Sequence, residues 1–227
     1  ITVTGAPATA ATFSYEAGGS GYLTNAGKNK EIKTTFNDET ELFTWSSTIT
    51  RHLTTGAIAD GGWLVVNDGP IPRQTVLEQV VFYLDGSKKK VFAYVYDGNK
   101  KAQSWETTDF LDSTDLIVDD TIEDERTFRF DFNMKRINAM TDTFGSDWEG
   151  TSFDDKIGVW YHGVDNLVTD HDNDDGSLSK FSFKNRTIFD IAMQNTTKSV
   201  PEPATAAALG MIVAAATFTK RRKKQSA

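Results

Sequence analysis

The sequence contains no cysteine among its 227 residues. Disulfide bonds, zinc–thiolate sites and thiol nucleophiles are therefore excluded. Export is still compatible with this absence, because a domain of this size can bury a stable core without covalent links. Histidine is scarce as well, and the three residues His52, His162 and His171 are scattered along the chain. We interpret isolated histidines of this kind as structural.

Motifs of the common hydrolases are missing. The chain has no Gly-x-Ser-x-Gly turn and no His-Glu-x-x-His helix, which leaves serine-hydrolase and zinc-protease chemistry without support. Glycoside hydrolysis needs two carboxyl groups that flank one bond. Acids are plentiful, but almost all of them lie in predicted turns or loops. We therefore predict a non-enzymatic protein and assign no catalytic residue.

Positive charge is scarce outside one short block. The net charge of −8 includes five basic residues at 220–224, and without them 19 basic residues face 32 acidic ones, a balance of −13. Such a body repels nucleic acid, because binding to phosphates requires a basic surface. It suits a solvated external protein that can hold divalent cations.

Period-two alternation of apolar and polar residues dominates the body. It occurs at 41–49, with Phe43, Trp45 and Ile49 on one face, and at 127–132. A third instance at 180–184 places Phe181 and Phe183 inward. This pattern is typical of half-buried strands in an antiparallel sheet.

Other segments are apolar on both faces and predict central strands: 63–66, 80–84, 91–96 and 157–161. Asp85-Gly86-Ser87 lies between two of them and favours a hairpin turn, and 67–70 and 97–99 are further turn signals. A short helix is expected only within 133–140. The sequence thus predicts one all-β domain over 11–193, an antiparallel β-sandwich of jelly-roll type.

The acidic loop at 170–176 is the candidate metal site. Carboxylates at one- and two-residue spacing in a turn that ends in glycine can converge on Ca²⁺. The register does not fit an EF-hand, and a solvated acidic loop is the alternative interpretation. A longer acidic stretch at 109–125 is interpreted as a solvated loop with a smaller share in calcium binding. The predicted calcium ligands are Asp170, Asp172, Asp174 and Asp175.

Exposed aromatic rings can form a platform for sugars, because each gives a flat apolar face with a polar tip. Core packing is the alternative, and it is favoured for Trp63 and Trp160 because each lies in an apolar strand. The candidate set comprises Trp63, Tyr94, Tyr96, Trp105, Trp160 and Tyr161, and we assign ligand binding to Tyr94, Tyr96 and Trp105.

The first residues resemble the end of a secretory signal peptide. Ala8-Thr9-Ala10 is an A-x-A cleavage pattern among small residues. We therefore expect 1–10 to be a residual signal peptide cleaved at Ala8 and Ala10, with the mature protein beginning near Ala11. A terminus that is merely rich in small residues is the alternative.

The last residues combine three features in order. Val200-Pro201-Glu202-Pro203 follows a polar stalk at 194–200, and an uncharged stretch at 204–219 comes next. Sixteen residues give about 24 Å of helix, somewhat short of the ~30 Å core of a bilayer. The positive-inside rule places the basic block in the cytoplasm and the body on the far side. That block is Lys220, Arg221, Arg222, Lys223 and Lys224.

This order resembles the PEP-CTERM sorting signal of Gram-negative bacteria, including cyanobacteria, over residues 200–224. The resemblance implies processing near Pro-Glu-Pro by an exosortase, a membrane enzyme similar to transpeptidases. It also implies species that build an exopolysaccharide or biofilm matrix. The body resembles an uncharacterised group of PEP-CTERM proteins that share a Gly-Gly-Trp-Leu-Val and Asp-Gly-Pro stretch, here Gly61 to Pro70.

The leading hypothesis is an exported envelope or matrix protein that is anchored in the membrane before processing. We expect it to bind glycan, exopolysaccharide in particular, with calcium as a structural ion. The alternatives are a secreted carbohydrate-active enzyme resembling glycoside hydrolases, and a structural or assembly subunit of the cell surface.

Overall fold

The computed structural model describes residues 12–19, 25–69, 71–72, 79–96, 109–140, 153 and 156–196. They all belong to one compact unit that spans 10–197. This unit is nearly all β, and every pair of neighbouring strands is antiparallel. In the described part of the chain, no helix is long and apolar enough to cross a bilayer.

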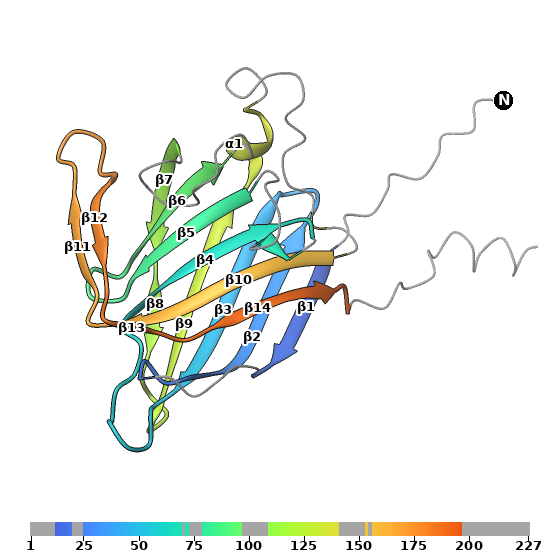
Figure 1. Ribbon diagram of the computed structural model, residues 1–227. Helices are drawn as coiled ribbons and strands as arrows, with labels where there is room; N and C mark the ends of the chain where they lie inside the picture. Colours follow the sequence, from blue (N-terminus) through green and yellow to red (C-terminus); the bar gives the residue numbers. More distant parts are fainter. Residues whose placement is uncertain are drawn as a thin grey trace, which may run out of the picture. The chain divides into compact units, whose positions relative to one another are not determined.

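One sheet has five strands and forms one layer of the unit (Figure 1). Its middle strands alternate strictly, so that Phe43, Trp45 and Phe130 are buried while Arg129 and Asp131 are exposed. The alternation predicted at 41–49 and 127–132 is thereby confirmed. The spatial order is β1 (Thr12–Gly18), β2 (Lys28–Asn37), β3 (Leu42–Thr50), β9 (Glu125–Asn133) and β8 (Ile117–Asp119).

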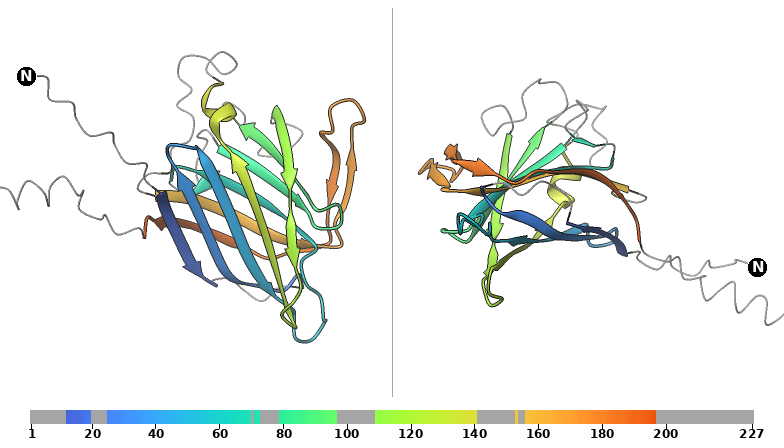
Figure 2. Two further views of the ribbon diagram at one scale, coloured as in Figure 1. Left: turned by 180° about the vertical axis from the view of Figure 1, so that it is seen from behind. Right: turned by 60° about the horizontal axis from the view of Figure 1, so that its bottom comes forward.

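The second sheet has seven strands and faces the first (Figure 2). β13 and β14 follow one another along the same edge of β10 in one unbroken register. The four apolar segments predicted as central strands all lie in this sheet. The order is β13 (Asn185–Arg186) with β14 (Phe189–Gln194), β10 (Lys156–Asp165), β4 (Gly61–Asn67), β5 (Gln79–Asp85), β6 (Lys90–Tyr96) and β7 (Asp109–Asp115).

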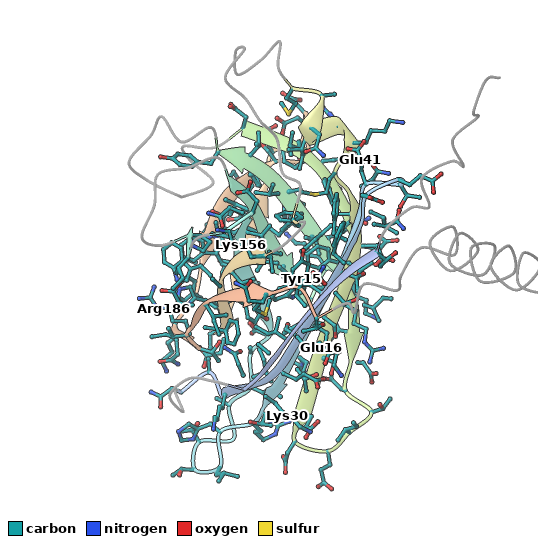
Figure 3. The ribbon with its side chains drawn as sticks, turned by 90° about the vertical axis from the view of Figure 1, so that its right-hand side faces the viewer. Tyr15, Glu16, Lys30, Glu41, Lys156 and Arg186 are labelled. Carbon is teal, nitrogen blue, oxygen red and sulfur yellow. The ribbon has the colours of Figure 1, made fainter. Side chains whose placement is uncertain are left out.

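Aromatic rings from both sheets meet in the interior. Phe43 of β3 stacks on Phe82 of β5 with ring centroids 5.7 Å apart, and Phe130 of β9 lies 5.0 Å from Phe82. Burying each such ring stabilises the fold by about 1.5–3 kcal/mol. Figure 3 labels two neighbours on β1, of which Tyr15 is fully buried and Glu16 is exposed. The sandwich arrangement therefore rests on a continuous apolar core between two layers.

A two-stranded hairpin stands apart from both sheets. It consists of β11 (Val168–His171) and β12 (Leu178–Ser182), and its inner side packs on the outer face of β5 and β6. Phe181 was expected to point into the core of the sandwich, but its ring lies 4.8 Å from that of Tyr83 on this outer face. Phe183 was also expected inside and is 36% exposed. Both predictions were wrong because the local alternation does not reveal which apolar surface a strand will cover.

The acidic stretch at 109–125 was interpreted as a loop, and that prediction is wrong. Residues 109–115 and 117–119 form β7 and β8, at one edge of each sheet. Acidic side chains at these edges discourage pairing with another chain. The predicted helix within 133–140 is confirmed as α1 (Lys135–Asn138), a single turn.

Candidate functional site: an aromatic face on the seven-stranded sheet

Several residues singled out in the sequence lie outside the described part of the chain. They are Trp105, Ala8 and Ala10, the Pro-Glu-Pro motif at 200–203, the apolar stretch at 204–219 and the basic block at 220–224. The signal peptide and the sorting signal therefore remain predictions.

The acidic loop joins β11 to β12, and its side chains hold the loop itself. Asp172 accepts a hydrogen bond from the Asp174 N–H at 2.8 Å, and Asp175 accepts one from the Ser177 N–H at 2.8 Å. The hydrogen bonds from Ser177 hold the pKa of Asp175 below its usual value. Asp170 lies 3.9 Å from Lys180. Each of these carboxylates thus makes its own local contact within the hairpin.

No group of three or more acidic or histidine side chains converges on a common point among the residues described. Calcium binding by Asp170, Asp172, Asp174 and Asp175 accordingly stays a prediction without an assembled ligand cluster. The sequence identified a real loop, but spacing along the chain does not determine where the carboxylates point.

The predicted aromatic platform divides between the two faces of the seven-stranded sheet. Tyr161 points into the sandwich core, where the Ser47 hydroxyl donates to its oxygen at 3.0 Å and burial raises its pKa. Tyr94 and Tyr96 lie on the outer face but are only 2% and 1% exposed. The Tyr94 oxygen accepts the Leu178 N–H of the hairpin at 2.6 Å, and burial raises the pKa of Tyr94 to about 12. Tyr94 therefore serves to seat the hairpin.

Trp63 and Trp160 form the accessible part of the outer face. They come from the adjacent strands β4 and β10, and their ring centroids are 4.5 Å apart. Both are half-buried, whereas the neighbouring His162 is 2% exposed. The imidazole of His162 stacks on Trp63 at 5.4 Å, and its Nδ1 lies 2.6 Å from the Thr187 carbonyl oxygen. This contact with Thr187 fixes the His162 ring under the two indoles.

Cross-strand pairing places the rings of His162, Trp63 and Tyr83 in one row across β10, β4 and β5. Trp63 lies opposite His162 on one side and Tyr83 on the other. Phe181 of the hairpin packs edge-on against Tyr83 and forms one wall. We call the set Trp63, Tyr83, Trp160, His162 and Phe181 the outer aromatic cluster. Since β-strand side chains alternate between faces, none of these rings contributes to the core between the sheets.

Three hydrogen-bond donors on this face have no acceptor. The indole N–H groups of Trp63 and Trp160 and the amide nitrogen of Asn67 are all buried and unpaired. Asn67 lies opposite Gly158, two pairs along the strands from the pair that contains Trp160, and therefore on the same face. Burying a donor without a partner costs about 1–3 kcal/mol, so such groups call for an explanation. These nitrogen atoms have almost no exposed surface, so they belong to the packing beneath the indoles, and a ligand on this face would contact the exposed ring surfaces instead.

Three aspartates fix the hairpin beside the outer aromatic cluster. Asp85 accepts hydrogen bonds from the hydroxyls of Thr169 and Ser87 and from the Lys88 N–H. Asp165 accepts from the Asn185 N–H at 2.8 Å, and Asp60 accepts from the Leu167 N–H at 3.2 Å. These contacts tie both ends of the hairpin to the seven-stranded sheet.

The pKa values of Asp60 and Asp85 are shifted in opposite directions, although both carboxyl groups are at least partly buried. Burial raises the pKa of Asp60, with a further contribution from the charge of Asp165. Burial also acts on Asp85, but the hydrogen bonds from Thr169, Ser87 and Lys88 outweigh it and hold the pKa of Asp85 below its usual value. Asp85 is therefore stabilised as an anion at the root of the hairpin, while Asp60 is not.

His171 anchors the far end of the hairpin. Its ring lies 4.4 Å from that of Phe92 on β6. Burial lowers the pKa of His171, and the charge of Lys88 acts in the same direction. A neutral imidazole packs on an aromatic ring at a lower desolvation cost than a charged one, which favours the docked hairpin near neutral pH.

Two surface cavities bordered by described residues lie elsewhere. The larger, about 290 Å³, contains Asp120 and Arg126, which are joined by two hydrogen bonds of 2.6 and 3.1 Å. The smaller, about 190 Å³, opens between β7 and β9 over Phe132 and Ile137. Each contains an acid paired with an arginine, Asp120 with Arg126 in the larger and Asp112 with Arg136 in the smaller. Among the residues described, neither is lined by a pair of indole rings that could hold a flat ligand.

Comparisons with known proteins leave the chain without an assigned family. No family model, curated protein or solved structure matches it.

Sequence reasoning missed part of the outer aromatic cluster. His162 was interpreted as structural, and its contact with Thr187 agrees with that role, but it also supports the Trp63 ring. Phe181 was assigned to the core. A usable signal was present in 180–188, where aromatic and basic residues alternate in an otherwise acidic chain.

Proposed function

We propose that this protein is an exported envelope or matrix protein whose β domain binds glycan through the outer aromatic cluster. The observation that carries the proposal is the pair of half-buried indoles, Trp63 and Trp160, on an outer sheet face. Their N–H groups are buried, so the exposed ring surface is what a ligand can contact. Sugar rings offer apolar C–H faces that pack on such indole surfaces.

The delivery route is part of the same proposal and comes from the sequence. Residues 1–10 act as the end of a signal peptide, and the PEP-CTERM-like tail at 201–224 holds the chain in the membrane for an exosortase. The stretch at 204–219 is the proposed membrane helix. The jelly-roll assignment, which is finer than a two-sheet antiparallel fold, belongs to the proposal as well.

Calcium has a weaker place in this proposal. If the loop at 170–175 binds Ca²⁺, a chelator should lower the melting temperature of the protein. Identical melting curves with and without chelator would contradict calcium binding by this loop.

A glycan array, followed by calorimetry on the best sugar, tests the binding function with the full chain. We expect Trp160→Ala to weaken binding by about tenfold, because the stacking contact of the indole ring is lost. Trp160→Phe keeps a smaller aromatic ring, so its affinity should lie between those of the wild type and of Trp160→Ala. Leu53→Ala, at a side chain 90% exposed on the loop between β3 and β4, is the control and should bind normally.

Thermal melting of each variant separates loss of binding from loss of fold. Binding that is equal in the wild type, Trp160→Ala and Leu53→Ala would contradict a site at the indoles. Absence of any glycan ligand would contradict the proposed function itself.

A further inference from the structure

The segment that carries Phe181 of the outer aromatic cluster is basic, although the body as a whole is acidic. Lys180, Lys184 and Arg186 fall within 180–188, a segment that contains no acid. Lys180 has one long contact with Asp170, at 3.9 Å. Lys184 and Arg186 have exposed side chains and form no ion pair with any described residue. Most other cations of the sandwich are paired with acids, so positive charge is locally available here.

Strand register places Arg186 beside the cluster. Arg186 lies opposite Val164 on β10, and Val164 is two residues from His162, so these side chains share the outer face. Because β13 and β14 keep the same register along β10, Ile188 comes opposite His162. Figure 3 shows Arg186 on the outer side of the seven-stranded sheet, away from β1. Diagonal neighbours of this kind lie roughly 7–8 Å apart, within reach of an arginine side chain.

Only part of the outer face can touch a ligand. Asn67 is completely buried and the indole nitrogens have almost no exposed surface, so a ligand meets the ring faces of the indoles and the side chains at their border. Among these border residues Arg186 is exposed and cationic, whereas Asp190, opposite Trp160, is half-buried. A neutral ligand would use the ring faces and leave the cation without a role.

Resting on the proposed glycan binding, we infer that the ligand is a carboxylate-bearing polysaccharide, a chain of uronic acid units. A sugar ring packs on the exposed face of the Trp160 indole. The carboxylate pairs with the guanidinium of Arg186, which can donate two parallel hydrogen bonds. Asp190 lies opposite Trp160 on β14, so the carboxylate lies toward Arg186 and away from Asp190. The acidic remainder of the body opposes unspecific attachment of polyanions elsewhere.

Polygalacturonate and the neutral polymer dextran, matched in chain length, provide the test with the full chain. We expect polygalacturonate to bind more tightly, and Arg186→Gln to weaken its binding by about tenfold or more, as expected for loss of a charged hydrogen-bonded pair. Arg129→Gln is the matched control, since Arg129 is a comparably exposed arginine on β9 of the other sheet, 3.8 Å from Asp119. It should leave the affinity unchanged. Added salt should weaken wild-type binding more than binding by Arg186→Gln.

Three outcomes decide between the claims. Loss of polygalacturonate binding in Arg186→Gln, but not in Arg129→Gln, supports the inference. Equal binding of dextran and polygalacturonate, both lost in Trp160→Ala, overturns the preference for a carboxylate while glycan binding stands. Absence of binding to either polymer and to every sugar on the glycan array overturns both.

Discussion

At the scale of single residues, glycines mark where backbones approach most closely. A Cβ on Gly86 would lie 2.3 Å from the carbonyl oxygen of Asp60, whereas a Cβ on Gly18 would meet nothing within 4 Å. Gly86 also donates its N–H to the same Asp60 oxygen at 3.0 Å. The predicted turn Asp85-Gly86-Ser87 thus contains a glycine whose small size, and not only its flexibility, is required.

Gly86→Ala should therefore destabilise the fold by about 1–3 kcal/mol, because the new methyl group displaces a backbone carbonyl next to the hairpin root. Urea unfolding measures this as a lower midpoint at an unchanged slope. Gly18→Ala in the edge strand β1 is the matched control and should shift the midpoint by less than about 0.5 kcal/mol. Equal effects of the two substitutions would contradict the close approach at Gly86.

At the scale of elements, the strands were predictable and their partners were not. Alternation at Phe43 to Ile49 and the doubly apolar run at 91–96 determine strands directly, because burial of each face follows from the sequence. The position of the hairpin β11–β12 depends on Tyr94, Asp85 and Asp165, which are distant in the chain. Only the three-dimensional structure brings such groups together, and for the same reason the outer aromatic cluster was incompletely predicted.

The root of the hairpin gives a prediction with a defined sign in pH. The pKa of Asp85 is lowered by folding, so its contribution to stability is present above its unfolded value and is lost as the pH falls through the folded value. The pKa of Asp60 is raised, so its contribution is present at low pH and is lost as the pH rises. Asp85→Asn should cost about 1–3 kcal/mol at pH 7 and less near pH 3.

Asp60→Asn is the matched control at the same junction. An amide oxygen can still accept the Leu167 N–H, and a half-buried charge beside Asp165 is removed. We expect unchanged or slightly higher stability at pH 7, measured by thermal melting at several pH values. If Asp85→Asn and Asp60→Asn lost the same stability at every pH, the opposite pKa shifts assigned to Asp85 and Asp60 would be contradicted.

At the scale of the whole molecule, charge separates the folded body from the tail. The basic residues at 220–224 contrast with a body that has a balance of −13, and the uncharged stretch at 204–219 lies between them. The stalk predicted at 194–200 can begin only after Thr196, because Gln194 ends β14 and Thr196 donates its N–H to the Ser14 carbonyl oxygen at 2.7 Å. On the proposed function, the sandwich presents the outer aromatic cluster to a polymer on the far side of the membrane. The proposed glycan binding and the proposed membrane attachment thus belong to separate segments of the chain.

Deletion of 201–224 should consequently release the protein in soluble form without changing its affinity for glycan. The reason is that an apolar stretch of sixteen residues followed by five cations favours insertion with the cations in the cytoplasm, while the site lies within 63–188. Cell fractionation measures release, and calorimetry on the released protein measures affinity. Replacing only 220–224 by glutamine is the control, and it should weaken retention less than the full deletion. Unchanged membrane retention after the deletion would contradict the anchor, and lost affinity in the released protein would show that the tail contributes to the binding site.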